Sequence, residues 1–198
     1  MRYQTITGVS MLESDLADIM EIDRLVYHED MSGDIRQMLK RFRRNPYSFV
    51  CIRNDEHIVG YINFFPCTDV LWDEITKTGT RFRDDDIEPY EIEDYRHAPA
   101  SNNLFILSVA IHPDYQHDRN AVIALSNAWL LYLRELEEDK YPITAIAGTV
   151  VSDDGTKFLT QRRFQYRRDD GEGHRVYVCE GEDLRRFLNN DVLYKRET

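Results

Sequence analysis

A short polar loop, residues 114–120 (DYQHDRN), is the stretch whose residue types and position best suit binding chemistry. It follows an apolar run, residues 104–111, and precedes residues 121–138, in which apolar side chains recur every three or four positions. The run predicts a central strand buried on both faces, and the spacing predicts an amphipathic helix. A helix N-terminus offers unpaired N–H groups to anions, so we expect phosphate binding at this loop. The alternative is an open helix end that contacts only water.

Other elements must position this loop. Towards the N-terminus the residue patterns predict a strand, two helices and a hairpin, at residues 3–9, 14–27, 35–44 and 47–65. Gly60 in the hairpin indicates a bulge or a close approach of backbone. After the long helix we expect a buried strand at residues 142–151 and a turn at residues 152–155, in which Ser152 caps a short helix at residues 156–163. A closing hairpin at residues 164–179 and a last helix beyond Gly181 are expected to follow.

Residues 67–100 differ in character, with ten acidic and four basic side chains. We expect an insertion that packs over one end of the sheet and helps to select the substrate. A solvated acidic loop is the alternative. The acidic composition favours a cationic substrate. On the second predicted helix, Lys40, Arg41, Arg43 and Arg44 are expected to form an exposed basic cluster.

Length and composition limit the classes of function. The chain has 198 residues, a formal charge of −11 and a pI near 5.0, which suit a single globular domain and exclude nucleic acid as the expected partner. No apolar run has the length of a membrane span and the N-terminus lacks the apolar core of a signal peptide, so no membrane partner and a cytoplasmic location are expected. The separated cysteines Cys51, Cys67 and Cys179 are expected to be reduced packing residues, and the scattered histidines predict no metal site.

The order of these elements resembles the GNAT superfamily of N-acetyltransferases over roughly residues 14–179. The strongest part is residues 107–116 (LSVAIHPDYQ), which resemble the central strand of that family and its entry to the cofactor loop. The resemblance implies an α/β (α+β) fold, with a mixed, mostly antiparallel central sheet flanked by helices. Residues 67–100 would then be an insertion between the third and fourth strands of a single acyltransferase domain, residues 1–198.

In the family the loop continues as [QR]-x-x-G-x-[GA] and its amides hold the pyrophosphate of acetyl-coenzyme A (acetyl-CoA). The resemblance therefore implies acetyl-CoA as co-substrate, with no metal. Arg119 stands where the family has glycine, and it either keeps the turn and adds a cation near the phosphates or blocks them. The cofactor-binding residues so implied are Ser108, Val109, Ile111, Gln116, His117, Asp118, Arg119, Asn120, Ala121, Val122 and Ser152.

Acetyl transfer to an amine requires a neutral nucleophile, a route for its proton and a donor to the developing oxyanion. The resemblance implies that a backbone N–H near Val109 polarises the thioester carbonyl. It brings Glu74, Asp69 and His97 near as candidate bases, and Tyr61 as a candidate proton relay. For each, a surface or packing role is the alternative. Leu159 aligns with the tyrosine that protonates the thiolate in the family, and Arg163-Phe164 aligns with its Gly-Phe.

The leading hypothesis is an acyl-CoA-dependent N-acyltransferase, most directly an N-acetyltransferase, that transfers acetyl to an amine of a small molecule or peptide without a covalent intermediate. One alternative is an N-acyl synthase that takes its acyl chain from acyl carrier protein, which would dock on the basic cluster. The other is a catalytically inactive GNAT-like module that binds a ligand or protein, suggested by Arg119 and Leu159. The acceptor, the acyl length and the oligomeric state, a homodimer included, stay open.

Overall fold

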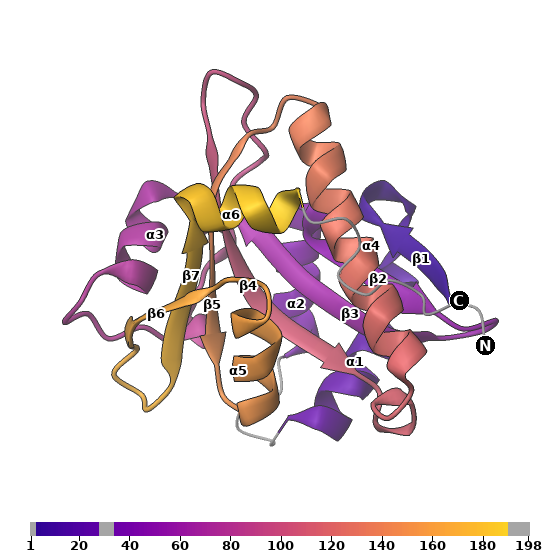
Figure 1. Cartoon of the computed structure of the whole chain (residues 1–198). Helices are drawn as coiled ribbons and strands as arrows, with labels where there is room; N and C mark the ends of the chain where they lie inside the picture. The colour runs from indigo at the N-terminus through magenta and orange to yellow at the C-terminus, as the bar shows by residue number, and fades with distance from the viewer. Residues whose placement is uncertain (1–2, 28–33, 190–198) are drawn as a thin grey trace. The chain divides into compact units, whose positions relative to one another are not determined.

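The computed structural model describes residues 3–27 and 34–189. Seven strands form one sheet in the order β1-β2-β3-β4-β5-β7-β6 (Figure 1). β4 and β5 are parallel, whereas β1–β2, β2–β3, β5–β7 and β6–β7 are antiparallel. The predicted mixed, mostly antiparallel sheet flanked by helices is confirmed. The strands are β1 (Gln4–Thr7), β2 (Phe49–Arg53), β3 (Ile58–Pro66), β4 (Asn102–Ile111), β5 (Ile143–Val150), β6 (Gln165–Asp169) and β7 (Arg175–Glu180).

The described helices follow the predicted order along the chain. They are α1 (Leu16–Val26), α2 (Ile35–Arg44), α3 (Asp69–Thr76), α4 (Arg119–Glu138), α5 (Asp153–Thr160) and α6 (Gly181–Leu188). By their internal contacts the residues group into two compact units. The first contains residues 3–27, 34–63 and 108–133 of the described chain, and the second contains residues 64–107 and 134–189. The single domain expected from the sequence remains a prediction.

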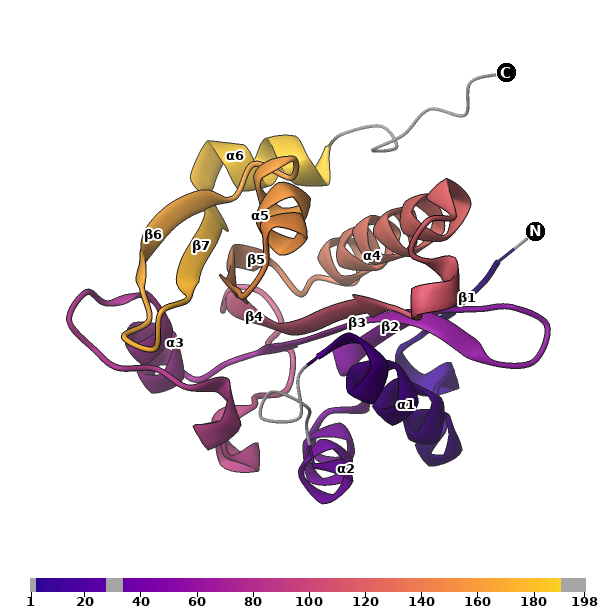
Figure 2. The ribbon, with the colours of Figure 1, turned by 90° about the horizontal axis from the view of Figure 1, so that it is seen from below.

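In the first unit, α1 and α2 lie on one side of β1, β2 and β3, and α4 lies on the other (Figure 2). The apolar stripe of α1 packs with residues of α2, β2 and β3, among them Leu16, Ile19, Phe42, Phe49 and Tyr61. A Cβ atom on Gly60 would lie 3.1 Å from the Ile111 side chain and 3.3 Å from the Ala110 carbonyl oxygen. The predicted close approach of backbone at Gly60 is therefore confirmed, and a larger residue there would require its neighbours to shift by a few tenths of an ångström.

The basic cluster expected on α2 differs in one member. Lys40 and Arg43 are exposed and Arg44 is half-buried, but Arg41 is 8% exposed and lies within the fold. Arg43 is held by Glu13 in a two-point ion pair, with Nε 2.8 Å from Oε1. An exposed run of all four cations was the wrong prediction, because the wide apolar face of α2 extends to the stem of Arg41.

In the second unit, α3 lies on one side of β4, β5 and β7, and α5 lies on the other (Figure 2). Leu71, Ile75 and Phe82 of the acidic insertion pack against Phe105 and Val178. The insertion is thus a packed element, and the alternative of a solvated acidic loop is wrong for its apolar residues. β4 is buried on both faces at residues 104–106, whereas residues 107–109 are half-buried, so continuous burial along this strand was too broad a prediction.

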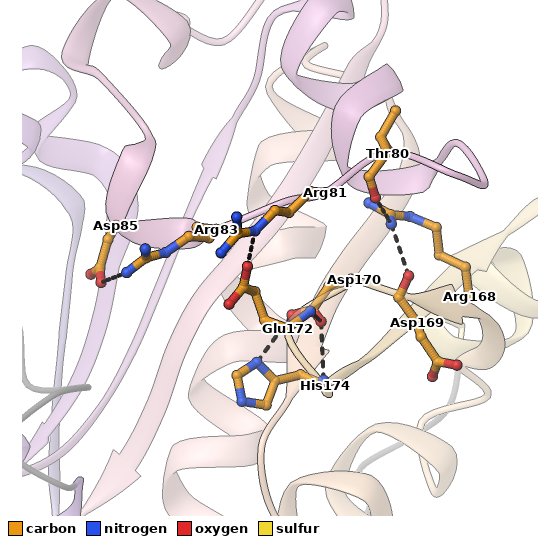
Figure 3. A network of polar contacts seen from close by, with 9 residues as sticks. All are labelled: Thr80, Arg81, Arg83, Asp85, Arg168, Asp169, Asp170, Glu172 and His174. Atoms are coloured by element: carbon orange, nitrogen blue, oxygen red, sulfur yellow. Dashed lines mark hydrogen bonds and ion pairs between the residues drawn. The ribbon is translucent and has the colours of Figure 1, made fainter.

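A buried arginine fixes the insertion to β6 (Figure 3). Arg168 is 2% exposed, and its guanidinium donates to the carbonyl oxygens of Ile75 (2.8 Å), Thr80 (2.7 Å), Glu74 (2.5 Å) and Asp169 (2.8 Å). Burial lowers the pKa of this guanidinium, and the charge of Asp170 opposes that shift. The main-chain carbonyl groups at the end of α3 and just after it therefore all bind a single cation, the Arg168 guanidinium.

The β6–β7 turn is held by a second buried group. The Asp170 carboxylate accepts hydrogen bonds from the amides of Glu172 (2.7 Å) and His174 (3.0 Å), and it lies 3.0 Å from His174 Nδ1. The Asp170 carbonyl accepts from the amide of Phe82 (2.9 Å), and Arg81 pairs with Glu172. These contacts join the β6–β7 turn to Arg81 and Phe82 of the insertion (Figure 3).

Replacement of Arg168 by methionine should lower the free energy of unfolding by at least about 2 kcal/mol, because several buried carbonyl groups lose their donor. Urea unfolding followed by circular dichroism measures this change. The matched control is Arg167→Met on the same strand, whose side chain is 42% exposed and pairs with Glu180, and which should change stability by less than about 0.5 kcal/mol. Equal changes in the two variants would contradict the assigned role of Arg168.

Replacement of Arg163 by glycine should stabilise the protein by about 1 kcal/mol. Arg163 has φ = 69° after α5, a left-handed conformation that strains any residue with a Cβ atom, and its contact with Asp183 is long at 4.0 Å. Thermal unfolding should show a higher midpoint for this variant. Gln161→Gly is the control, since Gln161 has φ = −62° and glycine there should lower the midpoint. A lower midpoint for Arg163→Gly would contradict the assigned strain.

Candidate functional site

The turn after β4 forms for local reasons. Pro113 is the first residue of a short 3-10 turn, Pro113–Tyr115, where its missing N–H group is not needed. The amide of Asp114 donates to His112 Nδ1 (3.3 Å), and the Gln116 side chain donates to the Ile111 carbonyl (3.0 Å). These bonds close the strand and lead directly into α4, which begins at Arg119. The predicted strand, loop and helix are confirmed.

A carboxylate occupies the N-terminus of α4. Asp118 Oδ1 accepts from the amide of Asn120 (2.8 Å), and Asp118 Oδ2 accepts from the hydroxyl of Tyr3 (2.7 Å). The hydrogen bond from Tyr3, followed by that from the Asn120 amide, lowers the pKa of Asp118. Asp118 is therefore a negatively charged helix cap of the kind that complements the helix dipole.

Three amides at the N-terminus of α4 are hydrogen-bonded within the protein and are not open to an anion. The amides of Ala121 and Val122 donate to the Asp118 carbonyl (2.9 and 3.3 Å), and that of Asn120 donates to its side chain. The cap satisfies these three amides within the protein, and the expected role of Asn120, Ala121 and Val122 in cofactor binding remains a prediction. Within residues 114–122, all of which the structure describes, the amides of His117 and Arg119 donate to no protein acceptor.

Arg119 keeps the turn. It is the first residue of α4, its side chain is exposed, and it is not among the described residues with positive φ. The conformational freedom of a glycine is therefore not needed at this position. The loop offers an anion two free amides and the guanidinium of Arg119, and it opposes that anion with the carboxylate of Asp118.

A chain of hydroxyl groups connects β4 to a buried acid. Ser108 Oγ donates to the Tyr61 hydroxyl (3.1 Å), and the Tyr61 hydroxyl donates to Asp23 Oδ1. Ser108 is half-buried, whereas Tyr61 and Asp23 are 0% and 5% exposed. Burial raises the pKa of Asp23 to about 6, and the hydrogen bond from Tyr61 opposes the shift. Burial, then the charge of Asp23, raises the pKa of Tyr61 well above its usual value.

Tyr27 positions the next residue of the strand. Its hydroxyl donates to the carbonyl oxygen of Val109 (3.0 Å), so the end of α1 holds the main chain of β4 beside Ser108. Neither Tyr27 nor Asp23 was among the candidate residues. The available signal was Asp23 itself, an acidic residue within the apolar stripe of an amphipathic helix, a position where an unpaired charge is unfavourable.

The other predicted catalytic residues lie in the second unit. Glu74 is exposed, and its carbonyl group accepts hydrogen bonds from Thr80 and Arg168. The exposed His97 stacks on Tyr141 with 4.2 Å between ring centroids, and the 86% exposed Asp69 side chain lies 3.9 Å from Arg96. The structure brings Tyr61 and Ser108 together, whereas the contacts of Glu74, His97 and Asp69 described here are with residues of the second unit, and their catalytic roles remain predictions.

Ser152 and Leu159 have structural roles in α5. Ser152 Oγ accepts from the amide of Gly155 (3.0 Å), which confirms the predicted helix cap. Leu159 is 4% exposed and lies against Gly148. A side chain at this position is directed into the core of the second unit and offers no proton donor.

The described residues, 3–27 and 34–189, contain no group of three or more histidine, cysteine or acidic side chains that could hold a metal ion. All three cysteines are unpaired and buried, and burial raises the pKa of Cys67 to about 12. In the same part of the chain no helix is both long and apolar enough to cross a bilayer.

Several solved structures are similar to this chain over most of its length. The loading GNATL domain of CurA from Lyngbya majuscula matches with 14% identity and a TM-score of 0.63, covering 91% of this chain and 98% of that one. The PaiA N-acetyltransferase from Thermoplasma acidophilum, in complex with coenzyme A, matches with 12% identity, a TM-score of 0.59 and coverage of 91% and 100%. The GphF GNAT-like decarboxylase, in complex with isobutyryl-CoA, matches with 11% identity, a TM-score of 0.60 and coverage of 90% and 98%.

Sequence comparison adds nothing to this likeness, since no protein-family model and no curated protein matches the chain. At identities of 11–14% the structural similarity carries information on architecture. The sheet order, the strand, turn and helix at residues 102–138 and these structural similarities together show that the protein has a GNAT-like fold.

Proposed function

We propose that this protein is an acyl-CoA-dependent N-acyltransferase, most directly an N-acetyltransferase that acts on an amine of a small molecule or peptide. The observation that carries the proposal is the half-buried end of β4, Ser108 and Val109, which continues through a closed turn into the N-terminus of α4 within a GNAT fold. That two similar proteins were solved with coenzyme A or isobutyryl-CoA supports a CoA thioester as the donor.

In the proposed reaction the amine nitrogen attacks the thioester carbonyl carbon, the C–S bond breaks, and the thiolate leaves with the bonding electrons. The amide of Val109 polarises the carbonyl, and Tyr27 fixes this stretch of main chain through the Val109 carbonyl. Because Leu159 is buried, no side chain at that position protonates the thiolate. A thiol with a pKa near 8.5 is an adequate leaving group without such help.

The donor phosphates are proposed to lie against the amides of His117 and Arg119, with the Arg119 guanidinium as counter-ion. Asp118 opposes them, because its carboxylate lies at the same helix end. Binding is therefore expected to be weaker than at a loop without this charge. The acceptor is proposed to be cationic in its free form, which the acidic insertion favours through its field.

The charge of Asp118 also favours a second candidate, a protein that takes its acyl chain from acyl carrier protein or that binds a ligand without turnover. Neither role needs a pyrophosphate at the N-terminus of α4. The exposed cations on α2 that could meet an acidic carrier protein are Arg36, Lys40 and Arg43, the last of them paired with Glu13, whereas Arg41 is buried.

Replacement of Asp118 by asparagine should strengthen the binding of acetyl-CoA by roughly five-fold, about 1 kcal/mol, because asparagine keeps the cap and removes the charge. Isothermal calorimetry at low and high salt measures the effect, which should shrink as salt screens the charge. Asp114→Asn removes an 83% exposed carboxylate from the same turn and is the control for net charge. An unchanged or weaker affinity for Asp118→Asn would remove the phosphates from this loop.

Incubation of the protein with acetyl-CoA and a panel of amines should release free thiol in proportion to acylated amine, as measured with a thiol reagent and by mass spectrometry. Binding without turnover across the panel would favour the non-catalytic module. Turnover with acyl carrier protein but not with acyl-CoA would favour the carrier-dependent synthase. If no acyl-CoA binds at millimolar concentration, the leading proposal fails.

A further inference from the structure

The buried carboxylate of Asp23 is paired with no cation among residues 3–27 and 34–189. It is 5% exposed, on a helix whose neighbouring residues Ile19, Met20 and Ile22 belong to the apolar core. Among the described residues its side chain has one hydrogen-bond partner, the hydroxyl of Tyr61, and no ion pair. A buried ionisable group held without a cation lowers stability and is found chiefly where its chemistry is used.

A chain of hydrogen-bonded hydroxyl groups connects Asp23 to the half-buried Ser108 on β4. Tyr61 on β3 faces Asp23, Ser108 on β4 contacts Tyr61, and Ser108 is the half-buried member of the chain. Another titratable group that acts on Tyr61 is Tyr27, whose hydroxyl donates to the Val109 carbonyl. On α2 the buried cation Arg41 forms no ion pair with Asp23. Each hydroxyl donates towards Asp23, so a proton that arrives at Ser108 can be passed inward at each step.

We propose that Asp23 is the terminal acceptor of the proton that the amine loses during acyl transfer, and that it acts through Ser108 and Tyr61. This inference rests on the proposed acyltransferase function. As the N–C bond forms and the C–S bond breaks, an amine proton passes to Ser108 Oγ, the Ser108 proton passes to Tyr61, and the Tyr61 proton passes to Asp23 Oδ1. Asp23 then returns its proton to solvent, and the thiolate takes one from solvent, so the reaction is balanced.

The relay explains the chemistry of each member. Tyr61 has a raised pKa and is not expected to lose its proton before another arrives, so it acts as a conduit and Asp23 acts as the base. The pKa of Asp23, about 6, leaves it deprotonated at neutral pH and close to the pKa suited to general-base catalysis. In this arrangement Ser108 is the group that meets the substrate, while Tyr61 and Asp23 are positioning residues.

The first test is the pH dependence of kcat/KM, measured by thiol release. Wild-type activity should fall as pH falls through about 6, because protonated Asp23 accepts no proton. Asp23→Asn should lose this limb and roughly 100-fold in rate at neutral pH. Tyr61→Phe removes the hydroxyl that connects Ser108 to Asp23, so it should likewise slow the reaction and lose this limb. Asp15→Asn, at another buried acid of the first unit, should leave the limb in place.

The second test needs no turnover. Asp23→Asn should raise the melting temperature at pH 8, raise it less at pH 5 and change it little below pH 3.8, because folding raises the pKa of Asp23 from 3.8 to about 6 and the aspartate loses stability as pH rises between these values. Asp15→Asn should lower the melting temperature, since Asp15 pairs with Arg53 at 2.6 Å. A lower melting temperature for Asp23→Asn at pH 8 would assign Asp23 a structural role and overturn the relay.

The two proposals fail in different ways. An unchanged pH profile in an active Asp23→Asn enzyme overturns the relay alone and leaves the acyltransferase in place. Absence of turnover in the wild type across amines and donors overturns the acyltransferase and the relay with it. A raised melting temperature together with loss of the acidic limb supports both.

Discussion

A polar group taken out of water must find its partner inside the protein, and this constraint decides the details of both units. An unpaired buried donor or acceptor costs about 1–3 kcal/mol, which is a large share of the stability of one domain. Arg168 meets the constraint with main-chain carbonyls and Asp170 with main-chain amides, and the partly exposed Asp118 is held in the same way by an amide and a phenol. Apolar packing determines the arrangement of the strands and helices, and these polar groups hold the turns and the insertion against the core.

Asp23 meets the same constraint less completely. One hydroxyl donor replaces the shell of water that a free carboxylate would have, so burial destabilises the charged form of Asp23 relative to its protonated form. Natural proteins keep such an arrangement where activity requires a base with a pKa near neutrality, and they lose stability in return. The first unit therefore differs from the second in kind, since its buried acid is poorly satisfied while the buried polar groups of the Arg168 network are well satisfied.

Local rules were sufficient for most of the fold. Alternation and helical spacing predicted the order of strands and helices, Ser152 was recognised as a cap from its position before a helix, and Gly60 was recognised as a close approach. These features depend on neighbours in sequence. The partner of Asp118 is Tyr3, 115 residues away, and the acceptors of Arg168 lie more than 80 residues away on the insertion, apart from Asp169 beside it. No spacing rule encodes such contacts, so the closed helix end and the anchored insertion emerged only in three dimensions.

The acceptors of Arg168 have a consequence for how this protein can diverge. Because the guanidinium binds carbonyl groups of the main chain, the identities of the side chains at positions 74, 75 and 80 are not what it recognises. Lineages that carry an arginine at this position are therefore free to change the charge and length of the exposed side chains on the insertion, while the buried Leu71, Ile75 and Phe82 keep their place in the core. The surface chemistry of the insertion would then change on a fixed backbone, one exposed residue at a time.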